Sequence, residues 1–147
     1  FFDRCRSERG KIAWYCGTKE DVNKKGPAVV GLSGDVSQMD VGLSAEDRKV
    51  LLAKVSIVFH VAATVRFNEH LRLSTLLNTR GTREMLTLAR NMSHLEAFVH
   101  VSTAYAHVCS HSKLMEERFY PVPIEPEDLI KAAEGMDEEK FQEIVDE

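Results

Sequence analysis

Two hydroxyl-bearing residues, Ser102 and Thr103, directly follow a short apolar run at residues 97–101. The run is rich in β-favouring residues and has no polar alternation, which is typical of a strand that helices cover on both faces, as in a parallel sheet. The hydroxyls would then lie at the carboxyl end of the strand, where ligands bind in open α/β sheets. A hydroxyl there can reach a substrate carbonyl, so Ser102 and Thr103 are the first candidates for a functional site.

Strands alternating with helices are predicted to position these hydroxyls. The first helix opens at Ser44, with Asp47 three residues on in a capping-box-like spacing. The strands fall at residues 28–32, 55–61 and 97–102, and the second helix at residues 69–92. The order strand, helix, strand, helix, strand predicts an α/β fold, part of a doubly wound parallel sheet with right-handed crossovers.

The long second helix is predicted to bury one face. Apolar residues recur along it at helical spacing: Leu73, Leu76, Leu77, Gly81, Met85, Leu88 and Met92. Glycine in a helix interior costs about 1 kcal/mol relative to alanine. Its presence on this face therefore indicates a close approach of Gly81 to a strand.

The two ends of the chain depart from this pattern. Residues 1–25 mix aromatic and charged side chains without a sustained period, which predicts a helix end followed by a loop. Beyond Tyr105 the chain is expected to be irregular, with two polar helices following at residues 126–134 and 137–147. Residues 113–147 carry four Lys or Arg against twelve Asp or Glu, so this acidic, mostly helical extension disfavours nucleic acid as a partner.

Composition bounds the class of protein. The 147 residues, 44% of them hydrophobic, suffice for one domain with a core, and no apolar run nears the roughly 18 residues of a membrane span. Cys5, Cys16 and Cys109 are odd in number and far apart, which indicates reduced thiols in an intracellular compartment. The first residues resemble neither a start methionine nor a signal peptide, which indicates a fragment of a longer protein.

Five short motifs stand in a fixed order between residues 28 and 125. They are Gly34-Asp35, residues 60–67 (His-Val-Ala-Ala-Thr-Val-Arg-Phe), residues 78–82 (Asn-Thr-Arg-Gly-Thr), residues 99–105 (Val-His-Val-Ser-Thr-Ala-Tyr) and residues 117–121 (Glu-Arg-Phe-Tyr-Pro). Together they resemble the fatty acyl-CoA reductases of the extended short-chain dehydrogenase/reductase superfamily, and insect members most of all. Residues 1–25 match that family poorly.

The resemblance implies that residues 1–147 are a partial Rossmann-type NAD(P)-binding domain that lacks its first strands. It implies NADPH as the cofactor and a long-chain fatty acyl-CoA as the substrate, which is reduced through an aldehyde to a primary alcohol. It also implies an intracellular location on the cytosolic face of the endoplasmic reticulum or peroxisome membrane, with membrane contact only through parts outside this stretch.

The resemblance assigns cofactor contacts to the ends of the predicted strands. Asp35 would accept a hydrogen bond from the adenine amine, and Ala62 and Ala63 would let backbone lie against the adenosine half of the dinucleotide. The full set is Gly34, Asp35, Val36, Ala62, Ala63 and Val101. Considered without the resemblance, Asp35 is a local cap in a turn, and the two alanines are strand end and core.

The resemblance also assigns the catalytic residues. It places Thr103 at the family's catalytic Ser/Thr position, with Ser102 before it, and Asn78 at a helix asparagine that stabilises the active-site backbone or a water near the catalytic lysine. Thr103 would donate a hydrogen bond to the carbonyl oxygen as hydride arrives. The alternative is that Ser102 and Thr103 only cap backbone groups at a strand end.

The superfamily also needs a Tyr-x-x-x-Lys pair, in which the lysine lowers the pKa of the phenol so that it acts as a general acid. The one match, Tyr15 to Lys19, lies far upstream and contains a helix-disfavouring glycine, so we interpret it as chance. The functional pair and the glycine-rich phosphate turn would both lie outside this stretch.

The histidines and cysteines do not predict a second site. His100, His107, Cys109 and His111 lack the paired spacing of a structural zinc site, so no metal is expected. Cys109 could form a thioester, yet its sequence context marks no activating base. Two other functions stay open, another extended reductase or epimerase and a catalytically inactive dinucleotide-fold module, and the sequence leaves the oligomeric state open as well.

Overall fold

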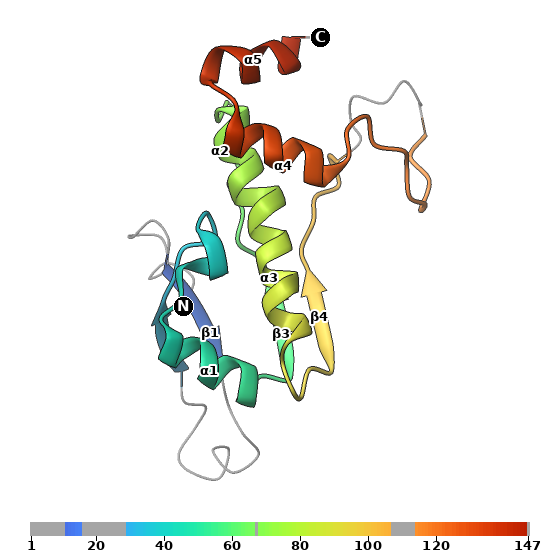
Figure 1. The fold of residues 1–147 in the computed structure, drawn as a ribbon. Coiled ribbons are helices and arrows are strands. Elements are labelled where there is room, and N and C mark those ends of the chain that lie inside the picture. Colours follow the sequence, from blue (N-terminus) through green and yellow to red (C-terminus); the bar gives the residue numbers. More distant parts are fainter. Residues whose placement is uncertain (1–10, 16–28, 67, 107–113, 147) are drawn as a thin grey trace.

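The computed structural model describes residues 11–15, 29–66, 68–106 and 114–146 of the chain. Strands and helices follow one another, and two helices close the described part (Figure 1). The strands are β1 (Lys11–Tyr15), β2 (Val29–Ser33), β3 (Ile57–His60) and β4 (Ala97–His100). The helices are the 3₁₀-helix η3 (Met39–Gly42), α1 (Ala45–Lys54), α2 (Leu71–Ser74), the π-helix η4 (Thr75–Arg80), α3 (Gly81–Arg90), α4 (Pro126–Gly135) and α5 (Glu138–Asp146).

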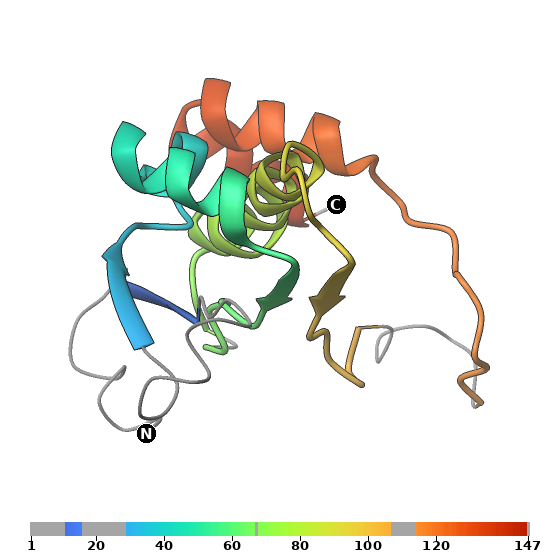
Figure 2. The ribbon, with the colours of Figure 1, turned by 90° about the horizontal axis from the view of Figure 1, so that it is seen from below.

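β3 and β4 form a parallel pair, as predicted for the second and third strands. His60 pairs with His100 in this register, and the helical stretch from α2 to α3 makes the crossover between the strands. Figure 2 shows the helices together on one side of the pair. Val58 and His60 are buried, whereas Phe59 is 64% exposed on the opposite face. Within the described residues, helices therefore cover one face of this sheet.

β2 forms a separate sheet with β1, so the three predicted strands do not lie side by side in parallel in the described structure. The two strands run antiparallel, with Lys11 opposite Ser33 and Tyr15 opposite Val29. The prediction of a helix end and loop is therefore wrong at residues 11–15. This short run favours strand, but the charged residues around it hide its period. Antiparallel pairing satisfies the backbone of β2 without the long crossover that a parallel partner requires.

The helix predicted to open at Ser44 is α1. The Ser44 hydroxyl accepts a hydrogen bond from the Asp47 N–H at 3.1 Å and donates one to the Asp47 carboxylate at 2.8 Å. An N-cap of this kind contributes about 1 kcal/mol to helix stability. The local sequence therefore sets where this helix begins.

The long crossover helix is not α-helical throughout. Its central part, η4, is a π-helix, in which each N–H bonds one residue further back than in an α-helix. The longer turn shifts the buried face, so Thr75 and Arg80 are buried while Leu73 is 40% exposed. The predicted buried face is therefore wrong at Leu73 and confirmed at Gly81, Met85, Leu88 and Met92.

Gly81 makes the predicted close approach, although to a turn and not to a strand. A Cβ atom at this position would lie 2.9 Å from the carbonyl oxygen of Val36, which follows the end of β2. Val36 belongs to the main core, with Val41, Leu51, Val55, Val58, Met85, Leu88, Ala89 and Met92. The crossover helix thus packs on the turn after β2 as well as on β3.

α4 and α5 pack on the start of the crossover helix, and both agree with the predicted helices. Ile130, Ala133 and Phe141 are buried there. Arg72 donates hydrogen bonds to the carbonyls of Ala133 and Met136, at 2.6 and 2.7 Å, and its guanidinium lies over the Phe141 ring. These bonds satisfy carbonyls that the end of α4 leaves without helical partners.

Candidate functional site

The turn after β2 carries Asp35, the residue predicted to meet adenine. One carboxylate oxygen of Asp35 accepts hydrogen bonds from the N–H and the hydroxyl of Ser37, at 2.9 and 2.7 Å. The other oxygen lies 3.3 Å from the side-chain nitrogen of exposed Gln38, so it can still accept from an exocyclic amine. Burial raises the pKa of the Asp35 carboxyl, but the bonds from Ser37 and Gln38 and the charge of Arg80 lower it overall. The carboxylate is therefore ionised near neutral pH, and the adenine contact that the resemblance implies stays a prediction.

The neighbours of Asp35 differ in what they can offer a nucleotide. Gly34 is half-buried in the same turn. Val36 is only 7% exposed because its side chain packs in the core. A contact from Val36 to a nucleotide would therefore come from its backbone.

The loop that follows Asp35 has an uncommon backbone conformation. Asp40, Val41 and Gly42 have φ values of 50°, 60° and 59°. A β-branched residue at positive φ costs of the order of 1–3 kcal/mol and persists only where its surroundings fix it. Val41 is fully buried, its carbonyl accepts from the Asp35 N–H at 2.8 Å, and the Asp40 N–H donates to the Glu84 carboxylate at 3.1 Å. The core and α3 together hold this loop.

Asn78 holds the chain that follows β3. Its side-chain oxygen accepts from the Thr64 N–H at 2.9 Å, and its side-chain nitrogen donates to the Thr64 carbonyl at 3.3 Å. These bonds fix the segment that carries Ala62, which packs against the core, and Ala63, which is exposed. Asn78 therefore holds the backbone of Thr64, close in sequence to the exposed Ala63.

A hydrogen-bonded chain joins the end of β3 to the crossover helix. His60 Nε2 lies 3.0 Å from the Thr82 hydroxyl, which donates to the Asn78 carbonyl at 2.6 Å. Because the single hydroxyl hydrogen is used in that bond, His60 donates from Nε2. The His60 ring stacks on that of His100, with centroids 5.3 Å apart. Burial lowers the pKa of His60, and His100 lowers it further, so His60 is neutral near neutral pH.

Ser102 and Thr103 follow the carboxyl end of β4, and both are exposed. The ends of β3 and β4 stay together here, because the Val101 N–H donates to the His60 carbonyl at 3.0 Å. Val101 itself is 52% exposed. The Thr103 hydroxyl oxygen accepts from the Tyr105 N–H at 3.2 Å. Within the described part of the chain no acceptor takes the Thr103 hydroxyl hydrogen, so this group can donate to a ligand.

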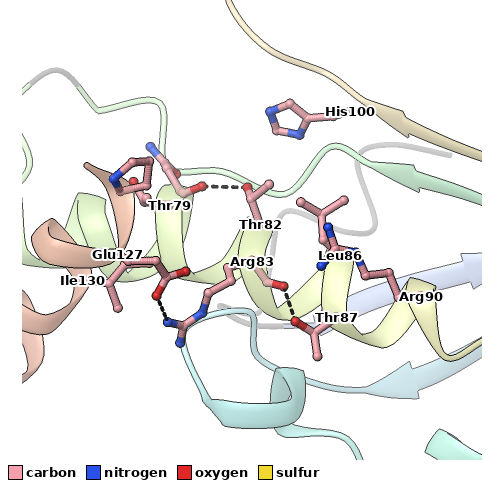
Figure 3. A pocket seen from close by; sticks show the side chains of 11 residues that line it. Thr79, Thr82, Arg83, Leu86, Thr87, Arg90, His100, Glu127 and Ile130 are labelled. Atoms are coloured by element: carbon pink, nitrogen blue, oxygen red, sulfur yellow. Dashed lines mark hydrogen bonds and ion pairs between the residues drawn. The ribbon is translucent and has the colours of Figure 1, made fainter. Parts of the chain in front are cut away.

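A hollow of about 480 Å³ lies between the crossover helix, β4 and α4 (Figure 3). Most of its lining residues are polar or charged, and the wall consists of Asn78, Thr79, Thr82, Arg83, Leu86, Thr87, Arg90, His100, Pro126, Glu127 and Ile130. Arg83 pairs with Glu127 at 2.8 Å across it. Of the residues predicted to bind or react, the hollow includes Asn78 alone, so it is distinct from the hydroxyls after β4 and from the Asp35 turn.

The structure therefore gathers the predicted residues at two places. One is the joined end of β3 and β4, with Ala62, Ala63, Ser102 and Thr103, and the other is the turn after β2, with Gly34, Asp35 and Val36. The crossover helix contacts both, through Asn78 and Gly81.

Sequence reasoning missed His60, Arg80 and Glu84. Each is buried, and each bonds to a residue far along the chain. The available signal was a charged or polar side chain on an otherwise apolar helix face or strand, which marks a group that needs a partner.

The remaining predicted features lie outside the described residues. These are the thiols of Cys5, Cys16 and Cys109, Lys19 of the Tyr-x-x-x-Lys match, and His107 and His111, whose spacing does not predict a zinc site. Among the residues that are described, no three His, Cys, Asp or Glu side chains gather as a metal site would require. No described helix is both long and apolar enough to cross a membrane.

Comparison with known proteins places these features in a family. Residues 8–146 match the model of an NAD-binding family described as male sterility protein. The chain is 46% identical over 116 residues to fatty acyl-CoA reductase 1 of Xenopus laevis, and this match covers 79% of this chain and 22% of that protein. It is 40% identical over 137 residues to fatty acyl-CoA reductase 1 of Homo sapiens (93% and 24%) and 43% identical over 113 residues to fatty acyl-CoA reductase 2 of Bos taurus (77% and 22%). The chain spans about a quarter of the length of these relatives.

Proposed function

Because this chain belongs to the NAD-binding family described as male sterility protein, we propose that the whole protein is an NADPH-dependent reductase of long-chain fatty acyl-CoA. The observation that carries the proposal is the 40–46% identity to relatives named fatty acyl-CoA reductases. The exposed Thr103 hydroxyl after the parallel pair of β3 and β4, and the ionised Asp35 carboxylate in the separate turn after β2, are consistent with it.

The proposed reaction reduces a thioester in two steps. NADPH, when bound, supplies a hydride to the thioester carbon in the first step and to the aldehyde carbon in the second. After the first, the carbonyl re-forms as the coenzyme A thiolate leaves and takes up a proton, which gives the aldehyde. After the second, the alkoxide takes up a proton and becomes the primary alcohol. Two NADPH and two protons are consumed for each alcohol.

In this proposal Thr103 holds the reacting carbonyl. It is exposed at the end of β4, and its oxygen already accepts a bond from Tyr105, so its hydrogen can point to the substrate oxygen. A donor of this kind stabilises the developing negative charge by about 3 kcal/mol. Ser102, also exposed, is a second donor beside it.

The adenosine half of the cofactor would lie between the Asp35 turn and the end of β3. Asp35 accepts from the exocyclic amine, while Ala63, exposed and small, lets the cofactor approach the backbone that Asn78 fixes. The choice of NADPH over NADH rests on the resemblance to fatty acyl-CoA reductases.

We also propose that the protein works at the cytosolic face of the endoplasmic reticulum or peroxisome membrane. This proposal, too, rests on the resemblance to fatty acyl-CoA reductases. A fluorescent fusion of the full-length protein, imaged with markers of both organelles, tests this location. A signal confined to the mitochondrial matrix or the nucleus would contradict it.

The activity is tested in the full-length protein with palmitoyl-CoA and NADPH, by measuring fatty alcohol by gas chromatography. Thr103→Ala should lower kcat about 100-fold, whereas Thr103→Ser keeps the donor and should stay within about tenfold of wild type. Unchanged turnover in Thr103→Ala would remove Thr103 from the mechanism. A wild-type protein that binds NADPH but forms neither aldehyde nor alcohol would instead be an inactive nucleotide-binding module.

A further inference from the structure

Arg80, at the end of η4, connects two parts of the structure that are distant in sequence. The side chain is almost buried, with 9% exposure. One guanidinium nitrogen donates to the Glu134 carboxylate of α4 at 2.8 Å, and another donates to the carbonyl of Ser37. Ser37 is the residue whose N–H and hydroxyl bind the Asp35 carboxylate. Arg80 therefore tethers the turn that carries the predicted adenine contact.

Two neighbours of Arg80 on the crossover helix hold the same loop. The Gly81 backbone lies against the Val36 carbonyl, and the Glu84 carboxylate accepts the Asp40 N–H at 3.1 Å. The loop they hold includes consecutive residues at positive φ, a conformation that relaxes when its surroundings stop fixing it. Loss of a tether would therefore change the loop and not merely loosen it.

Arg80 is an unfavourable residue for stability alone. Its Nε is buried and has no hydrogen-bond partner within the described part of the chain. A largely buried cation with an unsatisfied donor is often no better for stability than an apolar side chain of similar size. Fixing one conformation of the turn is a role that such a buried cation can serve.

We propose that Arg80 is a positioning residue that holds the Asp35 turn in the conformation that binds the adenine half of the cofactor, with Glu134 fixing its guanidinium. This inference rests on the proposed function, since it takes the cofactor to be NADPH. Arginine suits the task because its planar guanidinium donates to two acceptors in fixed directions, which a lysine ammonium does not do with the same geometry.

The test compares Arg80→Met with Arg72→Met in the full-length protein. Arg72 lies on the same crossover helix and also binds α4, through the carbonyls of Ala133 and Met136, but no bond joins it to residues 35–42 in the described structure. It therefore controls for looser packing of α4. The measurements are the Kd for NADPH by fluorescence, the inhibition constant of 2′,5′-ADP, which carries only the adenine end, and kcat at saturating NADPH.

Arg80→Met should raise the Kd for NADPH and the inhibition constant of 2′,5′-ADP about tenfold, because one charge-assisted hydrogen bond is lost. The kcat should stay within about twofold of wild type. Arg80→Lys should recover part of this loss. Arg72→Met should leave both constants within about twofold of wild type, because the tether to Ser37 is intact.

A wild-type Kd for NADPH in Arg80→Met would overturn the inference, and so would an equal rise in Arg72→Met, because packing of α4 would then be the cause. If Arg80→Met does not fold, Glu134→Ala carries the test. It should raise the Kd about threefold, and an unchanged Kd would overturn the inference. The two proposals can fail separately. If Arg80→Met weakens NADPH binding but the wild-type protein reduces no acyl-CoA, the proposed function is wrong and this inference still holds.

Discussion

Replacing Gly81 with alanine tests whether the crossover helix presses on the turn after β2. The added Cβ would lie 2.9 Å from the Val36 carbonyl oxygen and 3.3 Å from the Val36 Cβ, both shorter than an ordinary contact of 3.4–4 Å. Neither neighbour can swing away, because one is backbone and the other is a core side chain. Alanine gains about 1 kcal/mol over glycine in a helix interior, whereas overpacking costs about 1–3 kcal/mol. We therefore expect Gly81→Ala to destabilise the fold by about 1 kcal/mol.

The assay is thermal unfolding of the full-length protein with Gly135→Ala as the matched control. Gly135 ends α4, and an added Cβ there meets nothing within 4 Å. The control should therefore unfold at an equal or higher temperature than wild type, while Gly81→Ala unfolds at a lower one. A higher Tm for Gly81→Ala would refute the reasoning, because the gain in helix propensity would then exceed the cost of the short contact between the new Cβ and Val36.

Two further predictions concern the chain of bonds at the end of β3. Asn78→Asp keeps an acceptor for the Thr64 N–H but sets a carboxylate oxygen against the Thr64 carbonyl. Steady-state kinetics should show kcat at least about tenfold lower, and an unchanged kcat would show that this clamp does not serve the reaction. The pKa of His60 in the folded protein lies below its ordinary value of 6.5. As the pH drops below 6.5, the unfolded chain therefore binds a proton at this residue more readily than the folded protein does. The free energy of unfolding falls as a result. His60→Gln should flatten that decline in urea midpoints measured at descending pH, and an identical decline in both proteins would contradict it.

Features that depend on sequence neighbours could be predicted. Ser44 and Asp47 are three residues apart and bond to each other, so the start of α1 follows from residue types alone. The exposed position of Leu73 could not be predicted in this way, because a helical period assumes one geometry throughout and no residue type marks the π-helical turn that follows. β1 was missed for a related reason, since its run is short and charged residues flank it.

The candidate site could be predicted in part. Short motifs mark Asp35 and Asn78, and a charged side chain on an apolar helix face marks Arg80 and Glu84 as groups that need a partner, but nothing in the sequence identifies those partners. Arg80 bonds to a carbonyl 43 positions away, and Glu84 bonds to an N–H 44 positions away. Every residue has these backbone groups, so they leave no pattern to match. Only the packing of the crossover helix on the turn after β2 brings them together.

One element, the crossover helix, contacts both halves of the candidate site. Asn78 fixes the segment after β3, while Arg80, Gly81 and Glu84 fix the loop after β2. Asn78 and Arg80 lie in the π-helical stretch η4, and Gly81 and Glu84 follow in α3. The proposed hydride transfer would require reacting atoms about 3–3.5 Å apart, so a small displacement of either loop would be costly. Substitutions within residues 78–84 that move the helix itself should therefore change both cofactor affinity and turnover. A substitution that removes a single hydrogen bond to one loop should change only one of these two quantities.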